Sequence, residues 1–163
     1  MTSCFKNGFT LVEILVAVVL LALAITAIVA SNAAYTQATS QAVQFSTAGF
    51  LVEQIRELSA LFPMRDPVTG IAFFGPEPGE ISIALYDDVD DFDGAVFSPP
   101  IDSQRKPLTD FADYSQSVTV QNVSKTNFRQ TVADNSSDFV RVTVRIFYKN
   151  SEITNTSWIR SAN

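Results

Sequence analysis

An apolar run near the N-terminus constrains this 163-residue chain more than any other feature. From residue 14 to residue 30 only Thr26 is polar, and counted from Phe9 the run has 22 residues. As a helix rising about 1.5 Å per residue, it would span about 33 Å, close to the thickness of the hydrocarbon core of a bilayer. The sequence therefore predicts a membrane-spanning helix and leaves the rest of the chain for one small domain.

Glu13 is the charged residue in this run, and a charge inside a membrane span costs about 2.5–3.5 kcal/mol near the centre and less at the edge. A secretory signal peptide has an apolar run of about 7–15 residues and then a cleavage site. The run here is longer, and no polar flank marks a cleavage site after Ala30. A plain signal anchor, with Lys6 held inside, fits the length. It gives Glu13 no role beyond lying among lipid headgroups.

The segment GFTLVEILVAVVLLALA, residues 8–24, resembles the class III signal of type IV pilins and type II secretion pseudopilins. The resemblance implies that a prepilin peptidase cuts between Gly8 and Phe9, removes residues 1–8 as a leader peptide, and methylates the new N-terminal Phe9. It also implies that Glu13 pairs with the N-terminal amine of a neighbouring subunit in a filament. A buried carboxylate is tolerated when a cation pairs with it, and removing one partner costs about 3–5 kcal/mol.

The chain departs from the family pattern in two places. Asn7 stands before Gly8, where many members carry a basic residue, so that Lys6 must supply the leader charge. Ala30 occupies the place near the end of the span where major pilins usually carry a helix-kinking proline. The missing proline favours a minor pilin or minor pseudopilin over a major pilin. Cleavage also removes Cys4, the only cysteine, so the mature chain lacks the disulfide loop of many major pilins.

The helix is predicted to continue to residue 62, with residues 9–30 as the transmembrane and filament-core half and residues 31–62 as an amphipathic half. Apolar residues recur at helical spacing in the second half: Phe50, Leu51, Ile55, Leu58 and Leu61. Charged residues take the other side: Glu53, Arg56 and Glu57. Gly49 weakens the helix by about 1 kcal/mol relative to alanine, and Pro63 with Asp66-Pro67 ends it.

Residues 63–163 are predicted to form a globular, β-rich head. Residues 64–79, rich in proline and glycine, read as a loop, and residues 87–113 as irregular. Alternating apolar residues predict strands within 80–86, 114–124, 139–148 and 152–159, with a hairpin turn at Lys149-Asn150. A sheet of about four strands is too small to be stable without the helix on one face. The expected fold is α+β and pilin-like: a long N-terminal helix, its hydrophobic half protruding, packed on a small antiparallel sheet.

Within the family, the chain is most similar to minor pilins of the V type, to their relatives in mannose-sensitive haemagglutinin pili, or to the I-type minor pseudopilin. The resemblance rests on the proline-free span, on the stretch LVEQIREL at residues 51–58, and on the final hairpin.

Composition excludes several function classes. The chain has no histidine and one cysteine, which excludes a histidine-based catalytic dyad and a His/Cys metal site. Seventeen acidic residues against 11 basic ones argue against nucleic acid as a main partner. Loss of Lys6 with the leader would change the net charge from −6 to −7, which also disfavours a DNA-capturing competence pseudopilin.

The acidic stretch DDVDDFDG, residues 87–94, is a candidate Ca²⁺ site, because Ca²⁺ takes six to eight oxygen ligands. The expected ligands are Asp88, Asp90, Asp91 and Asp93. The stretch does not match an EF-hand loop, and the alternative is a solvated acidic turn held open by self-repulsion. No other cofactor is expected. Catalysis by a carboxylate pair is not expected either, because the sequence indicates no apolar pocket beside it.

The sequence thus predicts a non-enzymatic structural subunit. It would sit in the inner membrane by a single span with an extracytoplasmic C-terminal domain, and then enter a pilus or pseudopilus filament. Its partners would be the prepilin peptidase, other subunits and the inner-membrane assembly platform. Two alternatives are a membrane-anchored extracytoplasmic binding domain that is never assembled, which would tolerate Glu13→Ala, and an anchored enzyme. Whether the machine is a pilus, a secretion system or a DNA-uptake system is left open.

Overall fold

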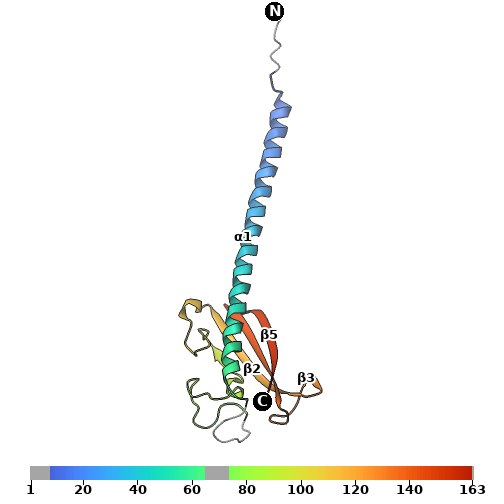
Figure 1. Ribbon diagram of the computed structural model, residues 1–163. Coiled ribbons are helices and arrows are strands. Elements are labelled where there is room, and N and C mark those ends of the chain that lie inside the picture. Colours follow the sequence, from blue (N-terminus) through green and yellow to red (C-terminus); the bar gives the residue numbers. More distant parts are fainter. Residues whose placement is uncertain (1–7, 65–73, 163) are drawn as a thin grey trace, which may run out of the picture. The chain divides into compact units, whose positions relative to one another are not determined.

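The computed structural model describes residues 8–64 and 74–162 (Figure 1). The chain divides into two units, residues 1–43 and 44–163, and helix α1 (Leu11–Leu61) contributes residues to both. The predicted single helix, uninterrupted at Gly49, is therefore confirmed. The leader apart from Gly8, and the Asp66-Pro67 pair predicted to help stop the helix, lie outside the described residues.

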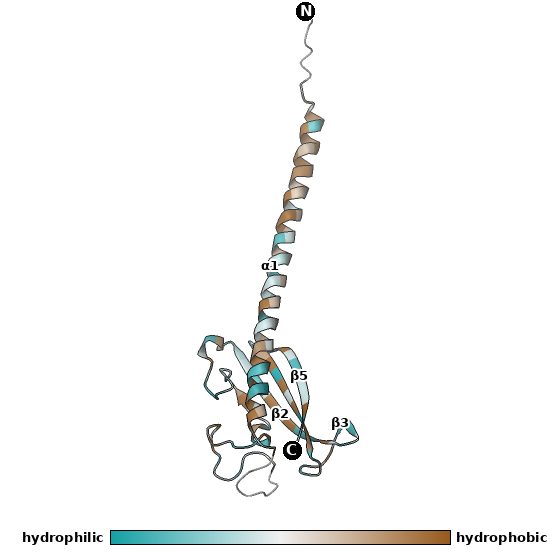
Figure 2. Cartoon of the chain, in the orientation of Figure 1, coloured by the Kyte–Doolittle hydropathy of each residue, from teal (hydrophilic) through white to brown (hydrophobic). Residues whose placement is uncertain are grey.

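Within the first unit, residues 14–30 of α1 are apolar on all sides apart from Thr26, and Figure 2 shows this part of the helix mainly in brown and white. By length and composition, the helix can cross a membrane, and its most apolar stretch has no residue buried within the protein. Amphipathic helices bury one stripe against a core, whereas a helix apolar all round needs apolar neighbours on every side. The stretch from residue 14 to residue 30 therefore needs lipid or other helices around it.

The part of α1 in the second unit buries one face against the sheet. Its buried residues share helical spacing: Ala48, Leu51, Val52, Ile55, Leu58 and Ser59. Glu53, Arg56 and Glu57 are exposed, as predicted. Two members of the predicted apolar stripe do not belong to this face, since Phe50 is 46% exposed and Leu61 is 75% exposed. The reason is geometric, because each successive residue is rotated by about 100° around the helix axis.

In the described part of the chain, five strands form an antiparallel sheet in the order β1-β2-β4-β5, with β3 paired to β2. They are β1 (Val96–Phe97), β2 (Tyr114–Ser124), β3 (Asn127–Thr131), β4 (Phe139–Tyr148) and β5 (Ser151–Ser161). The central pair, β2 and β4, alternates buried and partly exposed residues. Their inward side chains form the core with the buried face of α1: Val118, Val120, Val140, Val142, Val144 and Ile146.

Gln116 joins three parts of this core. Its side chain is fully buried on β2. The amide nitrogen donates to the carbonyls of Leu51 on α1 and Ile101 in the loop before β2, at 2.9 and 3.2 Å. The amide oxygen accepts from the backbone N–H of Ile101 at 2.8 Å. Both the donor and the acceptor of this buried amide therefore have partners, and the hydrogen bonds connect the helix, the loop and the sheet.

Arg160, near the end of β5, caps the C-terminal end of α1 with hydrogen bonds. Its guanidinium donates to the carbonyls of Ser59 and Phe62, the latter at 3.0 Å. The last turn of α1 contains no basic residue of its own, and the last carbonyls of a helix have no partner within it. A strand about a hundred residues away in sequence therefore supplies the donor.

The predicted hairpin turn between β4 and β5 is confirmed. Lys149 and Asn150 have φ values of 48° and 65°, as the two central residues of a type I′ turn require. The N–H of Lys149 also donates to the carbonyl of Asp113 at 2.9 Å. The turn fixes the register in which β5 pairs with β4.

Replacing Asn150 with alanine should lower the free energy of unfolding by about 1 kcal/mol, because the Cβ of a residue other than Gly, Asn or Asp is strained at positive φ. Asn150→Gly removes that strain and should leave the free energy of unfolding within about 0.5 kcal/mol of the parent. Urea denaturation of the full chain in detergent, followed by circular dichroism, measures both. Equal stability of the two variants would contradict the assigned turn.

The strand predicted within residues 80–86 is wrong. The segment forms turns instead, in which the N–H of Glu80 donates to the carbonyl of Glu77 at 3.0 Å and the N–H of Leu85 to that of Ser82 at 2.9 Å. Ile81 is 93% exposed, so the alternation of apolar residues does not mark a buried face here. Once these backbone groups are satisfied locally, they are not available to pair with a strand.

The irregular character of residues 87–113 is broadly confirmed, although three short elements lie within it: η1 (Asp90–Phe92), β1 and η2 (Thr109–Phe111). Strand β3 was not predicted. All five of its residues are exposed, so it carries no alternation of buried and exposed positions. It is held by its pairing with β2, including Val123 opposite Thr131.

Candidate functional sites

The first candidate site is the start of α1, where Thr10 and Glu13 form a reciprocal cap. The backbone N–H and the hydroxyl of Thr10 donate to Oε2 of Glu13 at 2.8 and 2.9 Å. The N–H of Glu13 donates to Oγ1 of Thr10 at 3.3 Å. This is a capping box, in which two side chains satisfy backbone N–H groups that the first turn leaves free. Glu13 is therefore held in place by its own helix before any neighbour arrives.

The cap gives Glu13 a local role that sequence reasoning missed. The signal was present, since Thr-x-x-Glu before an apolar run is the pattern of a capping box. Both Thr10 donors bond to the same oxygen, Oε2, so Oε1 points to no donor among the described residues. The cap thus orients the carboxylate and leaves one oxygen for a cation from outside the helix.

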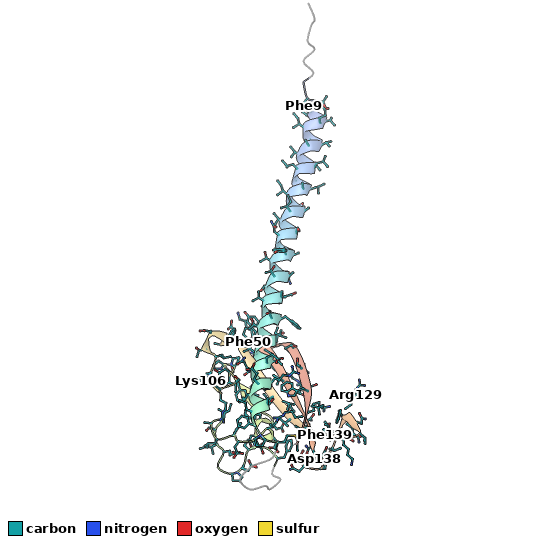
Figure 3. All side chains as sticks on the ribbon, viewed as in Figure 1. Phe9, Phe50, Lys106, Arg129, Asp138 and Phe139 are labelled. Atoms are coloured by element: carbon teal, nitrogen blue, oxygen red, sulfur yellow. The ribbon has the colours of Figure 1, made fainter. Side chains whose placement is uncertain are left out.

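Shallow apolar grooves lie at this end of α1, and one of them includes this carboxylate (Figure 3 labels Phe9 at the N-terminal end of the helix). One groove, of about 320 Å³, is lined by Phe9, Glu13, Ile14, Ala17, Val18 and Leu21. Another is lined by Phe9, Leu11, Ile14, Leu15, Val18 and Val19. A single carboxylate at the rim of an apolar groove can accept one positive charge while apolar side chains fill the rest.

The second candidate site lies in the loop before β1, where three carboxylates converge inside the head. Asp88, Asp90 and Asp91 are 1%, 4% and 0% exposed. One oxygen from each lies within 4.8 Å of the others. The alternative of a solvated acidic turn is therefore wrong, because these groups are buried.

Backbone donors hold two of these carboxylates. Oδ2 of Asp91 accepts from the N–H groups of Asp87 and Asp88 at 2.8 and 3.1 Å. Oδ1 of Asp88 accepts from the N–H groups of Asp90 and Asp91 at 2.9 and 3.3 Å. The backbone of the loop thus donates to the loop's own carboxylates. These hydrogen bonds explain why acidic residues so close in sequence point inward together.

Asp93, the fourth predicted ligand, lies outside this cluster. Its Oδ1 accepts from the N–H of Val120 on β2 at 2.8 Å, which fastens the loop to the sheet. Two glutamates that sequence reasoning did not select lie near Asp91 instead. One oxygen each from Glu77, Glu80 and Asp91 again falls within 4.8 Å. No short sequence motif joins Glu77 to Asp91, so this proximity could not be predicted from spacing.

Among the described residues, no ion pair offsets the negative charge of the carboxylates in this cluster. Burial, reinforced by a hydrogen bond with Asp88 and by neighbouring carboxylates, raises the pKa of Asp90 to about 9. Burial raises the pKa of Asp91 to about 6, although its backbone donors act in the opposite direction. Among residues 8–64 and 74–162, no lysine or arginine forms an ion pair with either group. The cluster therefore favours a bound proton or a bound cation over free negative charge.

A comparison with protein-family models matches residues 5–29 to the prokaryotic N-terminal methylation motif. The matched segment includes Gly8, Phe9 and the Thr10–Glu13 cap. Comparisons with curated proteins and with solved structures find no match to this chain.

Proposed function

From the premise that the chain carries a prepilin-type N-terminus of the type IV pilin and pseudopilin kind on a pilin-like α+β fold, we propose that it is a minor pilin or minor pseudopilin. In this role it is a structural subunit of a type IV pilus or a type II secretion pseudopilus. It is assembled within the filament or at its tip. It is a substrate of the prepilin peptidase and is not itself an enzyme.

The observation that carries this proposal is the position of the motif on α1. The methylation motif covers the stretch of helix that is apolar on every side and has no residue buried within its own chain. Lipid can surround such a helix before assembly, and the helices of other subunits can surround it afterwards. This supports a single-pass protein of the inner membrane, with residues 44–163 on the extracytoplasmic side, that later enters a filament.

The cap at the start of α1 supports the assignment of roles. Cleavage between Gly8 and Phe9 would free the amine of Phe9, close in sequence to the capped carboxylate, and the peptidase would then methylate this amine. In the filament, the carboxylate of Glu13 would accept the amine of a neighbouring subunit through Oε1 while Thr10 occupies Oε2. Apolar residues such as Leu11, Ile14, Leu15, Val18 and Leu21 would pack against other helices. The inner-membrane assembly platform would be the remaining partner.

The intact mass of the full chain, purified from membranes of cells that contain a prepilin peptidase, tests the proposal. The expected species lacks residues 1–8 and carries one added methyl group on Phe9. Gly8→Leu should leave the chain at full length, because a side chain at the cleavage site obstructs the peptidase. Gly49→Ala is the matched control: a Cβ there meets nothing within 4 Å, and this variant should be processed like the parent.

A full-length, unmodified parent chain under these conditions would contradict the proposal. The chain would then be a membrane-anchored extracytoplasmic binding domain that does not assemble, and Glu13 would have only its capping role.

A further inference from the structure

The buried carboxylates of the loop before β1 form a site for a ligand that the filament function does not use. We propose that Asp88, Asp90 and Asp91 bind one hard divalent cation of the Ca²⁺ class, with Glu77 and Glu80 at the edge of the site.

Geometry supplies the first argument. The oxygens of Asp88, Asp90 and Asp91 that face one another lie within 4.8 Å, and so do those of Glu77, Glu80 and Asp91. Two ligands of one Ca²⁺, each 2.3–2.6 Å from the ion, can be at most about 5 Å apart. Both groups meet this limit, and Asp91 belongs to both. Each group is therefore spaced as the ligands of one cation would be, and Asp91 can take part in either.

Buried oxygens without partners supply a second, independent argument. Oδ1 of Asp90 and Oδ1 of Asp91 are out of contact with solvent and accept no hydrogen bond, although the two residues are 96% and 100% buried. A buried carboxylate oxygen that accepts nothing is costly, and native proteins leave few of them. The backbone N–H groups of this loop already bond to the other oxygen of Asp91 and to Asp88. A cation would satisfy the oxygens that the loop leaves open.

The chemistry of the donors selects the class of cation. All the available side-chain ligands are carboxylates, and the chain has no histidine. Hard cations prefer oxygen ligands, whereas zinc and copper sites use nitrogen or sulfur. Ca²⁺ accepts irregular sets of six to eight oxygens, while Mg²⁺ needs near-ideal octahedral geometry and keeps several waters. Carboxylates crowded on one short loop suit Ca²⁺ better.

The cation would stabilise the loop that lies between the C-terminal end of α1 and the sheet. The N–H of Val89 donates to the carbonyl of Pro63 at 3.0 Å, directly after α1. The ring of Phe92 contacts the rings of Phe62 and Tyr86, with centroids 5.7 and 5.2 Å apart. Asp93 bonds to β2. Neutralising the carboxylates among these contacts would therefore stabilise the head as a whole.

Calorimetry and thermal denaturation of the full chain in detergent test the site, after metal is stripped with EDTA and the chelator is removed. We expect one Ca²⁺ to bind per chain, and the Tm to rise as CaCl₂ is titrated. MgCl₂ should bind more weakly. Fluorescence of Trp158, which packs under the guanidinium of Arg56 between the sheet and α1, reports unfolding.

Variants separate the site from general effects of charge. Asp90→Asn should weaken Ca²⁺ binding about tenfold or more, because the number of charged ligands sets the affinity of such sites. In EDTA, the same variant should melt at or above the Tm of the parent, because it removes repulsion. Asp93→Asn should bind like the parent, since an amide oxygen can still accept from Val120. Asp110→Asn, at an exposed carboxylate, is the matched charge control.

Absence of Ca²⁺ binding and of any Tm shift in the folded parent chain would overturn the proposal. Equal affinity of Asp90→Asn and the parent would do the same, because the cation would then lie elsewhere. Equal affinity for Mg²⁺ and Ca²⁺ would overturn the assignment to the Ca²⁺ class.

Discussion

Glu13→Ala should reduce incorporation of the chain into filaments about a hundredfold or more while leaving its cleavage intact. In the filament the variant would leave a buried amine without its carboxylate, which costs about 3–5 kcal/mol. Every 1.4 kcal/mol is a factor of ten in an equilibrium constant. Immunoblots of sheared filaments measure incorporation, and the intact mass of the membrane pool measures cleavage. The loss should therefore appear in the first measurement and not in the second.

Glu13→Gln separates the two roles of this residue. The amide oxygen of glutamine can still accept from Thr10, so the cap is kept while the charge is lost. We expect this variant to fail in assembly as alanine does. Thr26→Ala is the matched control, because the Thr26 hydroxyl donates only to the carbonyl of Leu23 in the same helix, at 2.8 Å. Normal incorporation of Glu13→Gln would leave capping as the sole role of Glu13.

Gln116→Leu should lower the free energy of unfolding by about 2–4 kcal/mol. The change keeps a side chain of similar size but removes three hydrogen bonds to the backbone of Leu51 and Ile101. The N–H of Ile101 would then be buried without an acceptor, and each such group costs about 1–3 kcal/mol. Urea denaturation of the full chain in detergent, followed by near-ultraviolet circular dichroism, measures the loss.

Gln104→Met is the control for this effect. Gln104 is exposed, and its side chain contacts Lys106 at the surface. Its replacement should change the free energy of unfolding by less than about 0.5 kcal/mol. A comparably small change for Gln116→Leu would mean that Gln116 does not connect the helix, the loop and the sheet.

The elements predicted best are those whose pattern is set by burial. Strand β4 (Phe139–Tyr148) matches its prediction at both ends, because its valines face the core and alternate with residues that face the other side. Strand β2 matches for the same reason. The long apolar run of residues 9–30 predicted a helix, and α1 confirms it from Leu11 onward. In each case a strong local pattern agrees with the tertiary environment, which is when sequence reasoning succeeds.

The elements that the sequence failed to predict have a different cause in common. Residues 80–86 alternate like a strand but have no partner strand, whereas β3 has a partner in β2 but does not alternate. Pairing depends on where the rest of the chain lies, and no local pattern records it. The same holds for the cluster of carboxylates. Sequence could mark Asp88, Asp90 and Asp91, but only the fold shows that Asp93 bonds to β2 and that Glu77 lies near Asp91.

The contact of Arg160 with the end of α1 has a consequence for the order in which parts of the chain fold. The ribosome makes the chain from its N-terminus, so Ser59 and Phe62 are made about a hundred residues before Arg160, which donates to their carbonyls. Contacts between residues so distant in sequence form only after a long loop has closed. The C-terminal end of α1 therefore lacks this donor until residue 160 has been made and β5 has paired with β4. A chain truncated before Arg160 would leave the carbonyls of Ser59 and Phe62 without this donor.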